Sequence, residues 1–89
     1  MSKQRYARVP AGPIVDLLER EFPTLHEHGY KTVMKPSDWK SIHNLTGVNP
    51  THIHTAIRRG SFTFVTADKI CIGLGYHPSN VFGETWETF

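Results

Sequence analysis

The histidines and the single cysteine have the broadest chemistry in this chain, because such side chains bind metals and transfer protons. His26/His28 and His52/His54 are pairs two residues apart, a spacing that on a helix turns the side chains about 200° apart. Zinc sites more often use cysteine-containing sets or histidines four residues apart. Cys71 falls on an apolar stripe, which predicts a packed thiol rather than a nucleophile. No metal site is therefore expected.

The motifs of the common enzyme classes do not occur in the sequence. It contains no phosphate-binding loop, no Ser/His/Asp arrangement and no paired carboxylates that suggest a cleft. We therefore expect that the protein is not an enzyme, has no catalytic residue and needs no cofactor.

The segment GVNPTHIHTAIRRG, residues 47–60, combines few apolar residues with many polar and cationic ones. On a helical wheel of about 100° per residue, Ile53, Ala56 and Ile57 lie together and predict one narrow buried stripe. The other positions carry hydroxyl, imidazole and guanidinium groups, on Thr51, His52, His54, Thr55, Arg58 and Arg59. A short helix with this pattern presents hydrogen-bond donors and positive charge to a partner outside the fold.

The elements that must position this segment are predicted to be about five short helices, so the expected fold is an all-α, compact bundle. Proline favours the first turn of a helix and glycine its end. The predicted helices cover residues 13–22, 38–46, 50–59 and 67–74, with a last short one after Pro78. Their apolar residues recur three or four positions apart. The predicted N-caps are Ser37, Asn49 and Thr66.

The segments between these helices have weaker patterns. Residues 24–29 are expected to add a helical turn, and residues 30–36 to be extended or a loop. Residues 61–65 alternate too briefly for a stable hairpin. No strand is therefore expected.

Basic residues are clustered, although the net charge of the 89 residues is only +2. They gather in an N-terminal arm over residues 1–12, ahead of a single domain over residues 13–89, and again from Lys31 to Lys69. This distribution predicts one positive face, and charges scattered for solubility are the alternative. The single cysteine suits a reducing compartment. Without a signal-peptide pattern or the roughly 20 apolar residues of a membrane span, we expect a cytoplasmic protein.

Residues 39–60, WKSIHNLTGVNPTHIHTAIRRG, resemble the helix-turn-helix of the lambda-repressor-like (Cro/repressor) superfamily. In that pattern a turn glycine precedes an apolar residue, as Gly47 precedes Val48 here. A buried residue follows five positions later, where this chain has Ile53. The flanking segments are similar to small helix-turn-helix proteins of actinobacteria and their phages.

The resemblance implies a helix-turn-helix core over residues 37–60 whose second helix, residues 49–59, enters the major groove of double-stranded DNA. The implied function is a sequence-specific transcription regulator of repressor or Cro type, encoded by a phage and associated with the nucleoid. The alternative, kept open, is an interaction protein that uses this fold to bind and inhibit a host protein.

The resemblance also implies roles for residues of the second helix. Arg58 and Arg59 bond guanine edges or phosphates, and Thr51, His52 and Thr55 make shorter contacts to bases. The alternative is that these side chains only solvate a short helix.

Other basic or polar residues are expected to hold the DNA backbone. The helix N-terminus at Asn49 receives a phosphate through its free N–H groups. Lys35 and Lys40 contact the backbone, and the arm with Arg5 and Arg8 follows a groove or remains disordered.

The sequence departs from the family pattern at His43, where a small alanine is usual, and in a longer loop over residues 30–37. His43 is expected either to crowd the contact between the two helices or to turn aside and bond a backbone group. Either arrangement changes the tilt of the second helix.

The aromatic tail carries Phe82, Trp86 and Phe89. Two roles remain open for these side chains, namely cover for the core of a small domain or the contact of a weak homodimer.

Overall fold

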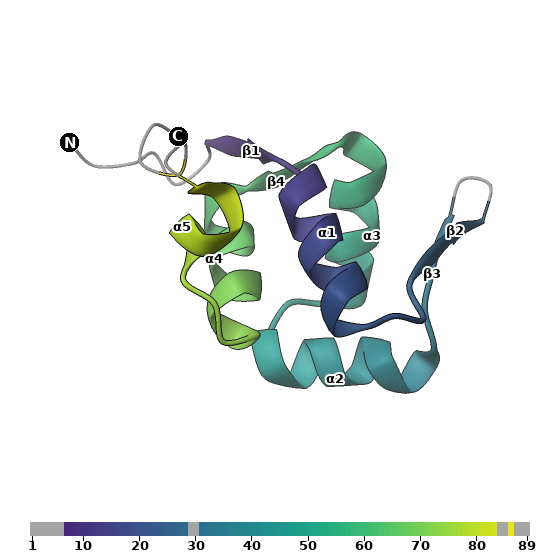
Figure 1. Ribbon diagram of the computed structural model, residues 1–89. Coiled ribbons are helices and arrows are strands. Elements are labelled where there is room, and N and C mark those ends of the chain that lie inside the picture. The colour runs from purple at the N-terminus through teal and green to yellow at the C-terminus, as the bar shows by residue number, and fades with distance from the viewer. Residues whose placement is uncertain (1–6, 29–30, 84–85, 87–89) are drawn as a thin grey trace.

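Proline lies in the first turn of four helices in the part of the chain that the structure describes, which is residues 7–28, 31–83 and 86. Its fixed φ suits that position, and its missing N–H would have no partner within the helix anyway. The helices of this computed structural model are α1 Gly12–Glu21, α2 Pro36–Thr46, α3 Pro50–Arg59, α4 Phe64–Gly73 and α5 Pro78–Phe82 (Figure 1). The prediction of a compact bundle of five short helices is confirmed.

Four three-residue strands accompany the helices within the described residues, so the prediction of no strand was wrong. The strands are β1 Arg8–Pro10, β2 His26–His28, β3 Lys31–Val33 and β4 Ser61–Thr63. β1 pairs antiparallel with β4, and β2 pairs antiparallel with β3. The segment expected to add a helical turn therefore forms a strand instead. Pairing supplies the backbone hydrogen bonds that a short isolated turn lacks, and local pattern alone does not show the partner.

The β1–β4 pair ties the start of the chain to the end of α3. Val9 lies opposite Phe62 in the register, and both side chains are fully buried. The N–H of Ala11 donates to the carbonyl of Gly60 at 3.0 Å. Arg8, assigned by the sequence to a free arm, is thus part of a strand, and ordered pairing begins before residue 13. Arg5 lies outside the described residues.

Two helix caps differ from the predicted ones. α4 begins at Phe64, and its cap is Thr63, whose hydroxyl oxygen accepts from the N–H of Thr66 at 3.3 Å. Thr66 is therefore the donor within the first turn, where it was predicted to be the cap. α2 begins at Pro36, so Ser37 lies inside the helix that it was predicted to cap.

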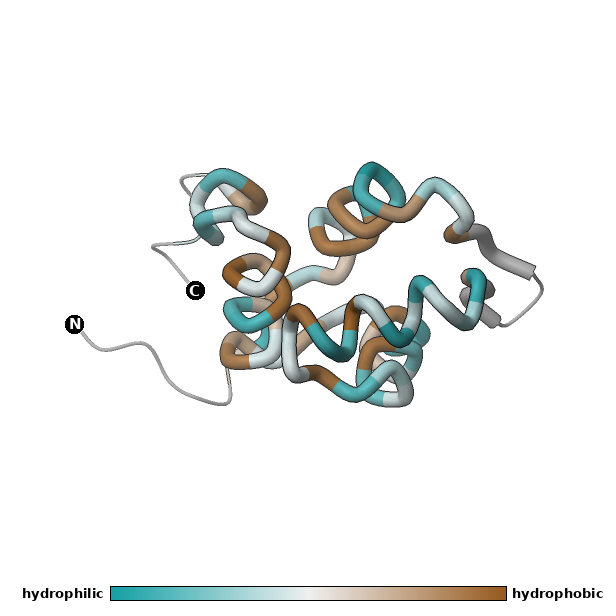
Figure 2. Tube along the Cα trace, turned by 90° about the horizontal axis from the view of Figure 1, so that it is seen from below, coloured by the Kyte–Doolittle hydropathy of each residue, from teal (hydrophilic) through white to brown (hydrophobic). Residues whose placement is uncertain are grey.

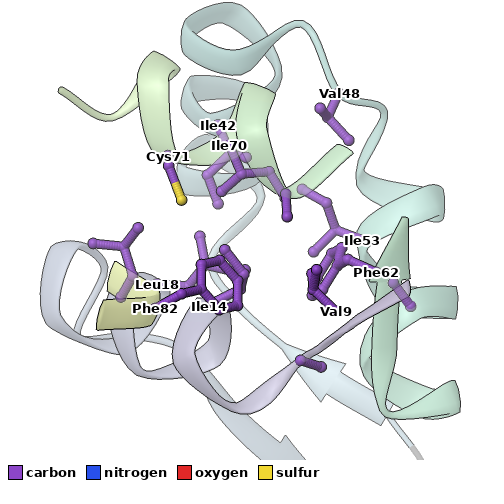
Figure 3. Close-up of a cluster of buried hydrophobic side chains, with 14 of the residues drawn as sticks. Val9, Ile14, Leu18, Ile42, Val48, Ile53, Phe62, Ile70, Cys71 and Phe82 are labelled. Atoms are coloured by element: carbon purple, nitrogen blue, oxygen red, sulfur yellow. The ribbon is translucent and has the colours of Figure 1, made fainter. Parts of the chain in front are cut away.

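The core lies between the helices and includes side chains from every helix and from β1 and β4 (Figure 3). The predicted packed thiol is confirmed, because Cys71 is fully buried. That burial, with a smaller effect of the Asp68 charge, raises the pKa of Cys71 to about 11. The apolar residues of α2, which recur three apart, are not all buried, since Ile42 is fully buried while Leu45 is 56% exposed. Thr46 takes the buried position instead.

Hydrophobic and hydrophilic residues alternate along the helices rather than forming one continuous apolar segment (Figure 2). Among the described residues, no helix combines the length and hydropathy needed to cross a membrane.

Candidate functional site

The turn between α2 and α3 is fixed by Gly47 and Thr46. Gly47 has a φ of 72°, the left-handed conformation that closes a helix, and its N–H donates to the carbonyl of His43 at 2.9 Å. The Thr46 hydroxyl donates to the Ile42 carbonyl at 2.7 Å and accepts from the N–H of Val48 at 3.1 Å. Thr46 therefore connects the last turn of α2 to the residue that leads into α3. Sequence reasoning missed this role, although a threonine just before a turn glycine is a possible signal.

The side chain of His43 is exposed, so it does not crowd the contact between α2 and its neighbours. The close approach of α2 occurs at Gly73 of α4, which lies against the backbone of Leu45 and Thr46. The predicted conflict at His43 is therefore absent, because the helix turns that side chain to solvent.

The N-terminus of α3 is capped as predicted. The side-chain oxygen of Asn49 accepts from the N–H of Thr51 at 2.9 Å. The Thr55 hydroxyl donates to the Thr51 carbonyl at 2.9 Å, one turn earlier. These bonds hold the first two turns of α3 in a defined geometry.

The predicted wheel of α3 agrees with the structure, except that Ile57 of the predicted buried stripe is only partly buried. Ile53 is fully buried and Ala56 is 8% exposed, so they anchor the inner side. The outer face, defined here as Thr51, His52, Thr55, Arg58 and Arg59, is exposed apart from the partly buried Thr55. α3 therefore rests on the core and presents three kinds of polar group outward.

One edge of α3 packs on α2 through His54. The His54 ring lies 4.4 Å from the Trp39 ring, centroid to centroid, at 48° between the planes. Burial, and secondarily the charge of Arg58, lowers the pKa of His54 below its usual 6.5. His54 therefore belongs to the helix–helix contact more than to the outer face.

The other edge of α3 borders a pocket of about 270 Å³. The pocket is lined by Arg8, His52, Thr55, Ala56, Arg59, Phe62, Thr63 and Thr66. Arg8 is held there because its Nε donates to the Ser61 hydroxyl at 3.0 Å and its Nη2 to the Ser61 carbonyl at 2.8 Å. The β1–β4 pair thus brings an arginine from the start of the chain beside one from α3.

The two lysines predicted to hold the DNA backbone are exposed, Lys40 on α2 and Lys35 just before it. Neither lines the pocket. Within the described residues, no three histidine, cysteine or acidic side chains lie close enough together to hold a metal ion.

Comparison of the chain with protein-family models, curated proteins and solved structures finds no match.

Proposed function

We propose that the protein binds double-stranded DNA in a sequence-specific manner, as a transcription regulator of repressor or Cro type. In this proposal α2 and α3 form a helix-turn-helix unit and α3 enters the major groove. The observation that carries the proposal is the outer face of α3, which presents polar and cationic groups while Ile53 anchors the opposite side in the core.

The dimensions of α3 suit the groove. A helix is about 10–12 Å across with its side chains, and the major groove is about 12 Å wide and admits one. Arg58, opposite the buried stripe, can donate two hydrogen bonds to guanine. Thr51 and Thr55 can contact a base edge or a thymine methyl group. The outer face thus offers the groups that distinguish one base pair from another.

The charge near α3 also favours a polyanion. From residue 39 to residue 67 the sequence has no aspartate or glutamate, but it has Lys40, Arg58, Arg59 and three histidines. Lys35 and Lys40, both exposed, can contact phosphates beside a docked helix. Positive charge on one face attracts DNA and positions it before any base is read.

A second candidate function is protein binding, with inhibition of a host protein. It is supported by Leu45 and Ile72, whose side chains are each 56% exposed on the neighbouring helices α2 and α4. These two side chains support protein binding less strongly than the outer face of α3 supports DNA binding, because isolated exposed aliphatic side chains are normal on protein surfaces.

Salt-dependent binding to random duplex DNA tests the main proposal. Fluorescence anisotropy should show an affinity that falls steeply between about 50 and 200 mM salt, because bound counterions are released from the DNA. Selection from a random duplex pool should then enrich one sequence. No binding at the lowest salt would contradict the proposal. Capture of a host protein from nuclease-treated lysate, together with that result, would favour the second candidate.

A further inference from the structure

Two arginines line the pocket beside α3 although like charges repel each other. Arg8 comes from β1 and Arg59 from the last turn of α3. None of the described residues that line the pocket carries a carboxylate to offset these charges. An arrangement of this kind is stabilised when an anion enters.

The orientation of Arg8 is set before any ligand binds. Its bonds to Ser61 use Nε and one N–H of Nη2, and the guanidinium has five N–H groups in a fixed plane. The remaining donors are available to a ligand. Because Ser61 pairs with Pro10 in the β1–β4 register, the short sheet keeps Arg8 beside α3.

The rest of the wall supplies further donors. The Thr66 hydroxyl accepts from the Thr63 hydroxyl at 2.8 Å and can donate its own proton into the pocket, and His52 carries an imidazole. The Thr55 hydroxyl already donates to the Thr51 carbonyl. Ala56 and Phe62 close the pocket on its apolar side. The volume of about 270 Å³ lies just below the roughly 300–1,000 Å³ of pockets for drug-sized ligands, so a single small anionic group suits it.

We propose that this pocket binds one phosphate-type oxyanion, held by the guanidinium groups of Arg8 and Arg59. Guanidinium groups bind phosphate through parallel, charge-assisted hydrogen bonds, and the Thr66 hydroxyl can donate a further bond to it. The oxyanion is a backbone phosphate of DNA or the phosphate of a free monoester. The first source rests on the proposed function, whereas the second does not require DNA.

The first test uses inorganic phosphate without DNA, at constant ionic strength with chloride as the exchanged anion. Two-dimensional NMR should show saturable shifts of backbone amides around the pocket, including those of Thr55, Thr63 and Thr66. Arg59→Ala should weaken phosphate binding roughly tenfold, through the loss of charged hydrogen bonds. Arg58→Ala removes the same charge from the same turn but does not line the pocket, so it should leave the phosphate affinity within about twofold.

Arg8→Ala should weaken phosphate binding as Arg59→Ala does, but it also removes the bonds to Ser61. Because Arg59 is exposed on α3, Arg59→Ala tests the pocket even where Arg8→Ala loosens the β1–β4 pair. Phosphate that produces no saturable shift would overturn the proposal. Equal weakening by Arg58→Ala and Arg59→Ala would also overturn it, since diffuse charge would then explain the binding.

Separate titrations with a nucleoside monophosphate and with duplex DNA distinguish the two sources. Shifts of the pocket amides with DNA, lost in Arg59→Ala, assign the site to a backbone phosphate. Shifts with the monophosphate alone assign it to a free ester. Phosphate binding without DNA affinity would contradict only the proposed function, whereas DNA binding without any response of the pocket to phosphate would contradict only the pocket.

Discussion

A Cβ atom added at Gly73 would lie 2.6 Å from the Cα atom of Thr46 and 2.5 Å from the carbonyl oxygen of Leu45. Carbon atoms in contact are normally about 3.5–4.0 Å apart, so only glycine allows α4 to approach α2 this closely. Thr46 is also the residue whose hydroxyl links the end of α2 to Val48. The absence of a side chain at Gly73 therefore supports the turn that positions α3.

Gly73→Ala should destabilise the fold. Helix propensity alone predicts a gain of about 1 kcal/mol for alanine in a helix. The backbone of α2 cannot yield as a flexible side chain can, so we expect a net loss of about 1–3 kcal/mol in the free energy of unfolding. Urea denaturation measures this change. Gly12→Ala is the matched control, because a Cβ atom at Gly12 meets nothing within 4 Å. A more stable Gly73→Ala variant would contradict the close packing of α2 and α4.

His54 should make stability depend on pH. Its pKa is lowered in the folded protein, so the unfolded chain takes up the proton first as the pH falls. The stability is therefore full above the unfolded pKa of about 6.5 and is lost as the pH falls through the folded pKa. The melting temperature should fall less in His54→Gln than in the parent between about pH 7 and pH 5. Trp39→Ala, which exposes the His54 ring to solvent, should likewise reduce the fall of the melting temperature over this pH range. If the melting temperature of His54→Gln falls with pH as steeply as that of the parent, His54 is not the source of the pH dependence.

Trp86→Ala should lower stability by about 3 kcal/mol or more, because the indole is part of the core. Trp86 is 4% exposed, and its ring stacks on the rings of Phe64 and Phe82, with centroid-to-centroid distances of 4.2 Å and 5.1 Å. The burial of Phe82 and Trp86 favours core cover over a dimer contact, and Phe89 lies outside the described residues.

Thermal unfolding and sedimentation together decide between these two roles of the tail. Leu45→Ala is the control, since this exposed side chain should contribute little to stability. The homodimer prediction holds instead if Trp86→Ala keeps the melting temperature of the parent protein, and if the parent sediments as a dimer while the variant sediments as a monomer.

Replacing both Arg58 and Arg59 by alanine should weaken DNA binding by at least about 2 kcal/mol, through loss of two charged contacts. Gel-shift titration measures this effect, with circular dichroism to confirm the fold. Arg20→Ala is the control, because it removes the same charge from the last turn of α1, where the guanidinium lies over the Tyr76 ring. It should have little effect on DNA affinity. Unchanged affinity in the double variant would count against α3 as the contact surface.

The sequence alone was sufficient to predict the five helices and which side of α3 is buried. Capping by Asn49, proline in first turns and the left-handed glycines at 47 and 60 are local features. The buried stripe of Ile53 and Ala56 likewise follows from helical periodicity within ten residues. These interactions join residues within a turn or two of each other, so their signals lie side by side in the chain.

Only the tertiary structure decided the features that join distant segments. β1 finds its partner in β4, which places Arg8 beside Arg59 and forms the pocket. Gly73 of α4 contacts Thr46 of α2, and no local sequence pattern at either position predicts that contact. Such contacts depend on how the helices pack against one another, because their free energy is gained only when the intervening chain has already folded.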